Sequence, residues 1–146
     1  MTPLHATTAA PTAASLVQAI QSALPDAQAA WLFGSAVRGE MHAESDIDIA
    51  VWLPNAWTVN EKIAAYALLS DQLKAPVDLL DFRRLPTVMQ VQILETGALL
   101  FSHHPAALEM YCARIRTEYL HIQRWRQPMI ERLAAELSQH TPLSAT

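Results

Sequence analysis

Two aspartates, Asp46 and Asp48, carry the clearest chemical signal in this chain. They are separated by one apolar residue, so on a β-strand both carboxylates would leave the same face. Adjacent carboxylates repel one another unless a cation lies between them. Mg²⁺ suits a site with few carboxylates whose coordination shell is completed by phosphate oxygens and water. The pair therefore predicts a magnesium site.

A glycine–serine pair, Gly34 and Ser35, lies ten residues before the aspartates. Glycine lacks a Cβ and lets the backbone approach a phosphate, while the serine hydroxyl and the following amides can donate to it. A helix that began at Ser35 would add its partly positive N-terminus. Arg38 would either neutralise a further phosphate oxygen or pair with an acidic neighbour such as Glu44 or Asp46. We expect a phosphate-binding loop here.

The stretch "VDLLDF" offers a third carboxylate. Asp78 and Asp81 are three residues apart, so on a strand they point to opposite faces and only one can join the pair. We choose Asp78, because it is nearer the middle of the apolar run, where a carboxylate most needs a partner. Asp78 would act as a general base or as a shared ligand of a second metal ion. A structural bond to a backbone amide is the alternative.

The elements around these residues are typical of an α/β domain. Period-2 alternation from Ile47 to Leu53 predicts a strand, and apolar runs predict three more, at 29–33, 77–82 and 98–101. Helices are predicted at 12–24, 58–74, 86–96 and 105–138, with Pro128 either kinking the last helix or starting another. This order predicts a small mixed sheet of about four strands flanked by helices.

Composition narrows the class of protein. The chain has 146 residues, 51% of them hydrophobic and 16% charged, which favours one folded domain over disorder. The formal net charge of −4 argues against direct nucleic-acid binding, which needs a basic face. The single cysteine, Cys112, excludes an internal disulfide and is expected to be buried and inert. We find no signal peptide or membrane span, so a cytoplasmic protein is expected.

The C-terminal segment, 105–146, follows the expected domain at 12–104 and a flexible tail at 1–11. It holds five arginines, half of the ten basic residues of the chain. It also has an apolar stripe spaced by three, four or seven residues: Leu108, Cys112, Ile115, Tyr119, Ile122, Met129 and Leu133. The stripe fits packing either on the domain's own sheet or on an acidic or helical partner. Binding to a membrane surface fits less well.

The stretch "FGSAVRGEMHAESDIDIAV" resembles the signature of the DNA polymerase β nucleotidyltransferase superfamily. In particular, it is similar to the minimal nucleotidyltransferases, which are antitoxins to HEPN ribonuclease toxins. "VDLLDF" and "ILETGALLF" extend the resemblance over roughly Ala29 to Ser102. Val37 stands where the family often has alanine, a mild departure.

This resemblance implies a nucleotidyltransferase fold and AMP transfer from ATP to a tyrosine of the toxin, with two Mg²⁺ ions. By position, Gly34 and Ser35 would hold the triphosphate, Asp46 and Asp48 the metals, and Asp78 would be the third acid. Two other functions stay open. One is an antitoxin that neutralises only by binding, and the other is an enzyme that modifies a small molecule such as an aminoglycoside.

Overall fold

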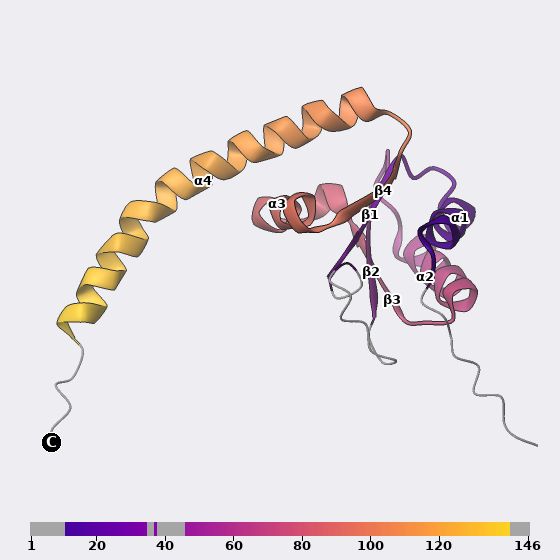
Figure 1. Ribbon diagram of the computed structural model, residues 1–146, viewed down its shortest axis with the longest axis horizontal. Coiled ribbons are helices and arrows are strands. Elements are labelled where there is room, and N and C mark those ends of the chain that lie inside the picture. The colour runs from indigo at the N-terminus through magenta and orange to yellow at the C-terminus, as the bar shows by residue number, and fades with distance from the viewer. Residues whose placement is uncertain (1–10, 35–36, 38–45, 141–146) are drawn as a thin grey trace, which may run out of the picture.

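A four-stranded mixed sheet with helices on both faces forms the body of the protein (Figure 1). The computed structural model describes residues 11–34, 37 and 46–140. Its elements are α1 (Ala13–Ala23), β1 (Ala29–Phe33), β2 (Ile47–Trp52), α2 (Val59–Leu73), β3 (Val77–Asp81), a 3₁₀ turn η2 (Phe82–Arg84), α3 (Thr87–Thr96), β4 (Ala98–Ser102) and α4 (Pro105–Gln139). The predicted fold class and element order are confirmed.

The sheet has the strand order β3-β2-β1-β4. β1 pairs antiparallel with both β2 and β4, whereas β2 and β3 pair in parallel. In Figure 1, α1 and α2 lie on one side of the sheet and α3 on the other. The strands β2 and β3 therefore begin at the same edge of the sheet as β1 ends, and this edge brings the predicted chemical residues together.

Local signals define most helix ends. Thr58 accepts a hydrogen bond from the Glu61 amide at 3.1 Å, and Glu61 accepts one from the Thr58 amide at 3.2 Å, so the predicted capping box is present at the start of α2. Lys74 ends α2 in the left-handed conformation. Gly97 follows α3, as predicted. β3 is one residue shorter than expected, because Phe82 begins the 3₁₀ turn.

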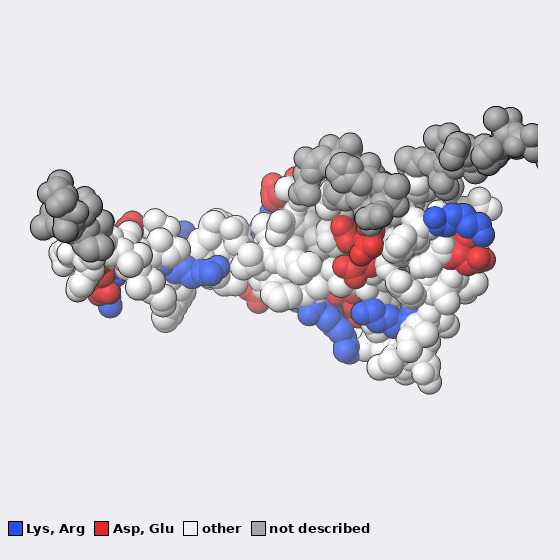
Figure 2. Space-filling model, turned by 90° about the horizontal axis from the view of Figure 1, so that it is seen from below, with Lys and Arg blue, Asp and Glu red and all other residues white. Residues whose placement is uncertain are grey.

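The last helix, α4, is one continuous element of 35 residues. It leaves the body of the protein, as two perpendicular views show (Figures 1 and 2), and it bends along its length in Figure 1. Pro128 lies inside it, so the expectation that a second helix starts there is wrong. None of the described helices is long and apolar enough to cross a membrane.

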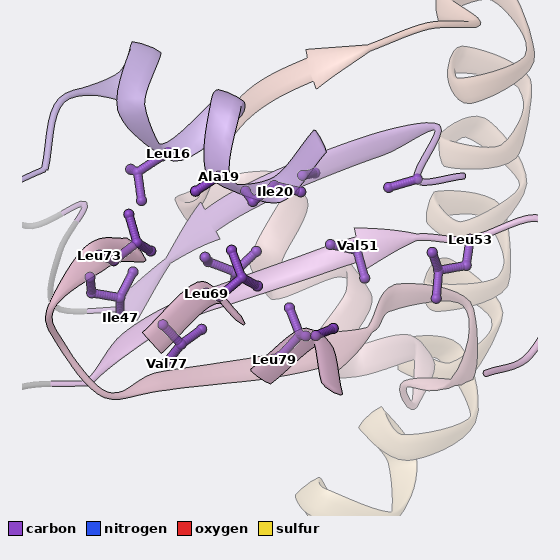
Figure 3. Close-up of a cluster of buried hydrophobic side chains, with 14 residues drawn as sticks. Leu16, Ala19, Ile20, Ile47, Val51, Leu53, Leu69, Leu73, Val77 and Leu79 are labelled. Carbon is purple, nitrogen blue, oxygen red and sulfur yellow. The ribbon is translucent and has the colours of Figure 1, made fainter. Parts of the chain in front are cut away.

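The main core lies between the sheet and the α1–α2 layer (Figure 3). Ile47 and Ile49 of β2 and Leu79 of β3 point into it, where they meet Ile20 of α1 and Leu69 of α2. All five side chains are buried. Because these residues occupy every second position of their strands, the residues between them must face the other side of the sheet.

A second core anchors the first half of α4 on that other side. Leu108, Cys112 and Ile115 of α4 pack there with Trp31 and Trp52, so the first part of the C-terminal stripe covers the domain's own sheet. Burial raises the pKa of the Cys112 thiol, and Glu109 adds to the rise while Arg116 opposes it. The thiol is therefore buried and protonated, as expected.

Gln90 of α3 joins this second core to α4. Its side chain is 4% exposed. The Gln90 amide nitrogen donates to the Phe82 carbonyl at 2.8 Å and to the Tyr111 hydroxyl at 3.3 Å. The Tyr111 ring in turn stacks on Trp52, with centroids 5.2 Å apart. A single buried amide thus holds together α3, the turn after β3 and the start of α4.

We predict that Gln90→Ala lowers the free energy of unfolding by about 2 kcal/mol, because a buried carbonyl loses its donor and a cavity is left. Urea denaturation followed by circular dichroism measures the change. Gln92→Ala on the exposed face of the same helix is the matched control and should cost well under about 1 kcal/mol. Equal losses in the two variants would contradict this role for Gln90.

Candidate active site

The close approach of Gly34 to Asp48 forms the centre of the site. β1 ends at Phe33, which pairs with Asp48 of β2, so Gly34 follows directly beside the carboxylate. Gly34 has φ +74°, in the left-handed region that favours glycine. A Cβ at Gly34 would collide with Oδ2 of Asp48 and would lie 3.2 Å from its Cγ. Glycine is thus required here for the position of the carboxylate as well as for the turn.

The parallel register of β2 and β3 places Asp78 directly opposite Asp48. Both residues alternate with side chains of the main core, so both carboxylates lie on the face of the sheet away from α1 and α2. Asp48 is half-buried and Asp78 is exposed. Two acidic side chains from different strands are therefore neighbours at one edge of the sheet, beside Gly34.

Asp81, the alternative third carboxylate, has a structural role. It is only 8% exposed, accepts a hydrogen bond from the Arg83 amide at 3.2 Å, and lies 3.6 Å from Nε of Arg84. It caps the turn that follows β3. The register thus places Asp78, rather than Asp81, beside Asp48.

Asp46 lies just before β2 and is exposed. The strand is held there by the Ile47 amide, which donates to the Pro76 carbonyl at 2.9 Å. Figure 2 looks at the molecule from this edge and shows acidic side chains gathered in the middle of the view. Ser35 and Arg38, the two other residues predicted for phosphate binding, lie outside the described residues.

The donor chemistry of this edge suits Mg²⁺. Carboxylate oxygens from Asp46, Asp48 and Asp78 are the hard ligands that this ion prefers, and phosphate oxygens commonly complete its shell. Among the described residues, no three acidic, histidine or cysteine side chains are already gathered into a metal-binding group. The protein alone therefore provides a register-paired Asp48 and Asp78, with Asp46 nearby, and a bound phosphate would have to supply further ligands.

A comparison with known protein families assigns this fold to a family. Residues 16–106 match the family described as "Polymerase beta, Nucleotidyltransferase". The chain belongs to this nucleotidyltransferase family.

Its relatives include a protein of known activity. The protein adenylyltransferase MntA of Shewanella oneidensis is 32% identical over 126 residues, which cover 82% of this chain and 86% of that protein. The chain is therefore similar to MntA over most of both lengths.

Solved structures of toxin–antitoxin complexes match most of the chain. A crystal structure of a toxin–antitoxin with AMP-PNP aligns with a TM-score of 0.72 and 27% identity, covering 85% of this chain and 99% of the matched chain. A complex of tri-AMPylated Shewanella oneidensis HEPN toxin with MNT antitoxin aligns with a TM-score of 0.66 and 25% identity, covering 84% and 95%. The resemblance to minimal nucleotidyltransferase antitoxins is confirmed.

We predict that Gly34→Ala and Asp48→Ala are coupled in stability. The first substitution alone should cost about 1–3 kcal/mol, because alanine is strained at this φ and its Cβ meets the Asp48 carboxylate. Removing that carboxylate relieves the collision, so the double variant should lose at least about 0.5 kcal/mol less than the two single losses together.

Denaturant titration of all four proteins measures this coupling. Asp71→Ala, on the exposed end of α2, is the matched control and should add independently to Gly34→Ala. Strict additivity of Gly34→Ala with Asp48→Ala would contradict the close approach.

Proposed function

We propose that this chain is a Mg²⁺-dependent protein adenylyltransferase of the cytoplasm that transfers AMP from ATP to a tyrosine hydroxyl of a cognate HEPN toxin and so neutralises it. The observation that carries the proposal is the pairing of Asp48 with Asp78 beside Gly34. The AMPylated toxin and the ATP analogue in related complexes support the same reaction.

The residues of the site divide into two groups by chemistry. Gly34, with Ser35 and Arg38, would hold the triphosphate through backbone amides, a hydroxyl and a guanidinium. Asp46, Asp48 and Asp78 would hold two Mg²⁺ ions. When bound, these ions neutralise the phosphate charge and favour departure of pyrophosphate. The half-buried position of Asp48 between two strands keeps its carboxylate oriented.

In the proposed step, the tyrosine oxygen attacks the α-phosphorus of ATP. A bond forms between that oxygen and the α-phosphorus, the bond from the α-phosphorus to the bridging oxygen of the β-phosphate breaks, and pyrophosphate leaves. The phenolic proton passes to the carboxylate of Asp78, directly or through one water molecule. Asp78 suits this role because it is exposed on the edge strand β3, where an acceptor side chain can reach it.

We predict that Asp46→Asn combined with Asp48→Asn lowers AMP transfer about 100-fold or more, since removing both charges weakens metal binding. Labelled ATP, Mg²⁺ and the HEPN protein encoded in the neighbouring reading frame provide the assay. The exposed carboxylate of Asp71, which pairs with Lys74 at 3.4 Å, offers a matched control: Asp71→Asn should transfer AMP at the wild-type rate. Wild-type transfer by the double variant would rule out the assigned residues.

Toxin neutralisation in cells separates catalysis from simple binding. The double variant should fail to protect cells while still binding the toxin in vitro, because its substitutions lie at the sheet edge and leave both cores intact. Full protection by the double variant would favour the alternative of a non-catalytic antitoxin. Label transfer to an aminoglycoside and not to the toxin would favour a small-molecule enzyme.

A further inference from the structure

The second half of α4 carries an apolar surface that the rest of the chain does not cover. Every residue from Gln123 to His140 is exposed. Trp125 is 82% exposed and Met129 is 61% exposed. We call the following residues of this half the free stripe: Trp125, Met129, Ile130, Leu133 and Leu137.

The free stripe continues the face of α4 that packs on the domain. Cys112 and Ile115 are buried, and the half-buried Tyr119 and Ile122 follow at spacings of four and three residues. Met129 comes seven residues after Ile122, and Leu133 and Leu137 follow at intervals of four. These spacings keep the side chains on one side of a helix. One apolar face thus covers the sheet in its first half and extends past it in its second.

A helix that extends alone with this face in water is not expected to be stable by itself. The free part spans about 25 Å at 1.5 Å per residue, and isolated helices of about this length are marginal. A row of large apolar side chains with an exposed tryptophan is the composition of a protein-binding helix. This half of α4 therefore needs a partner that covers the free stripe and stabilises the helix.

The free stripe is also well placed for the reaction. Leu108, Cys112 and Ile115 fix α4 on the same side of the sheet from which Asp48 and Asp78 project. A groove of about 590 Å³ lies between α3 and α4, and Tyr119, Leu120 and Gln123 of α4 line part of it. Glu95 and Arg116, 3.5 Å apart, form an ion pair between the two helices there. A partner on the stripe would therefore lie on the face of the sheet from which the two carboxylates project.

We propose, resting on the function above, that the free stripe docks a helix of the HEPN toxin and holds the toxin for AMP transfer. Related complexes match 85% of this chain. Only 104 of the 146 residues precede Pro105, which is a smaller share of the chain, so the match includes part of α4. Arg126, between Ile122 and Met129, suits a carboxylate on the partner helix. Glu131 and Glu136 lie in the same half and disfavour an anionic membrane surface.

The test uses the full chain with Leu133→Glu as the docking variant and Ala135→Glu as its control. Both positions are exposed in the same turn of α4, but their side chains lie on different faces of the helix, so neither change disturbs a core. The probe is the purified HEPN protein from the neighbouring reading frame. Affinity is measured by calorimetry without ATP, and AMP transfer is measured at increasing toxin concentration.

We expect Leu133→Glu to weaken toxin binding and to raise the KM for toxin, each about tenfold or more, with little change in kcat. Ala135→Glu should match the wild type. Wild-type affinity and KM in Leu133→Glu would overturn the docking site while AMP transfer still stood. If the wild type bound the toxin through the stripe but transferred no AMP, the proposed function would fail and the docking site would remain.

Light scattering of the isolated chain tests the competing occupant. A monomer that becomes a 1:1 or higher complex only with toxin supports the proposal. A stable dimer that Leu133→Glu converts to a monomer, with toxin affinity unchanged, would show that a second copy of the chain covers the stripe and would overturn the proposal.

Discussion

The site depends on one constraint: three strands must meet at one edge of the sheet closely enough that Asp48 lies against the backbone of Gly34 and opposite Asp78. Placing two carboxylates on facing positions of neighbouring strands has an electrostatic cost, because like charges repel one another. The hydrogen-bonded register and the buried side chains on the other face of the same strands offset that cost. The arrangement suits a protein that binds a divalent cation, whose charge neutralises both the carboxylates and a phosphate.

Each of the two cores positions a different part of the molecule. The α1–α2 core fixes the register of β2 and β3, through Ile47, Ile49 and Leu79, and hence the positions of Asp48 and Asp78. The α3–α4 core, linked by Gln90, fixes the direction in which α4 leaves the domain. The reacting groups and the helix proposed to hold the partner therefore lie on the same face of one sheet, so the proposed docking would bring the substrate to the side from which the carboxylates project.

Much of the fold followed from local patterns. Alternation around Ile47 and Ile49 predicted a strand with both aspartates on its outer face, and Thr58, Gly97 and Pro105 marked helix ends. The contact between Gly34 and Asp48 did not follow, because strand register depends on tertiary packing that a single sequence does not contain. The choice of Asp78 over Asp81 rested on position in an apolar run, and the register and the cap formed by Asp81 now give it a physical reason. For α4, periodicity predicted one apolar face but not the point, near Gln123, where the domain stops covering it.

Crystals grown with Mn²⁺ and a non-hydrolysable ATP analogue test the central claim most directly. Mn²⁺ takes the same oxygen ligands as Mg²⁺ and is located by its anomalous scattering. We predict an anomalous peak within about 2.5 Å of carboxylate oxygens of both Asp48 and Asp78, a distance typical of divalent cations on oxygen ligands, with the triphosphate against Gly34. A nucleotide bound elsewhere, or a metal that contacts neither carboxylate, would contradict the account.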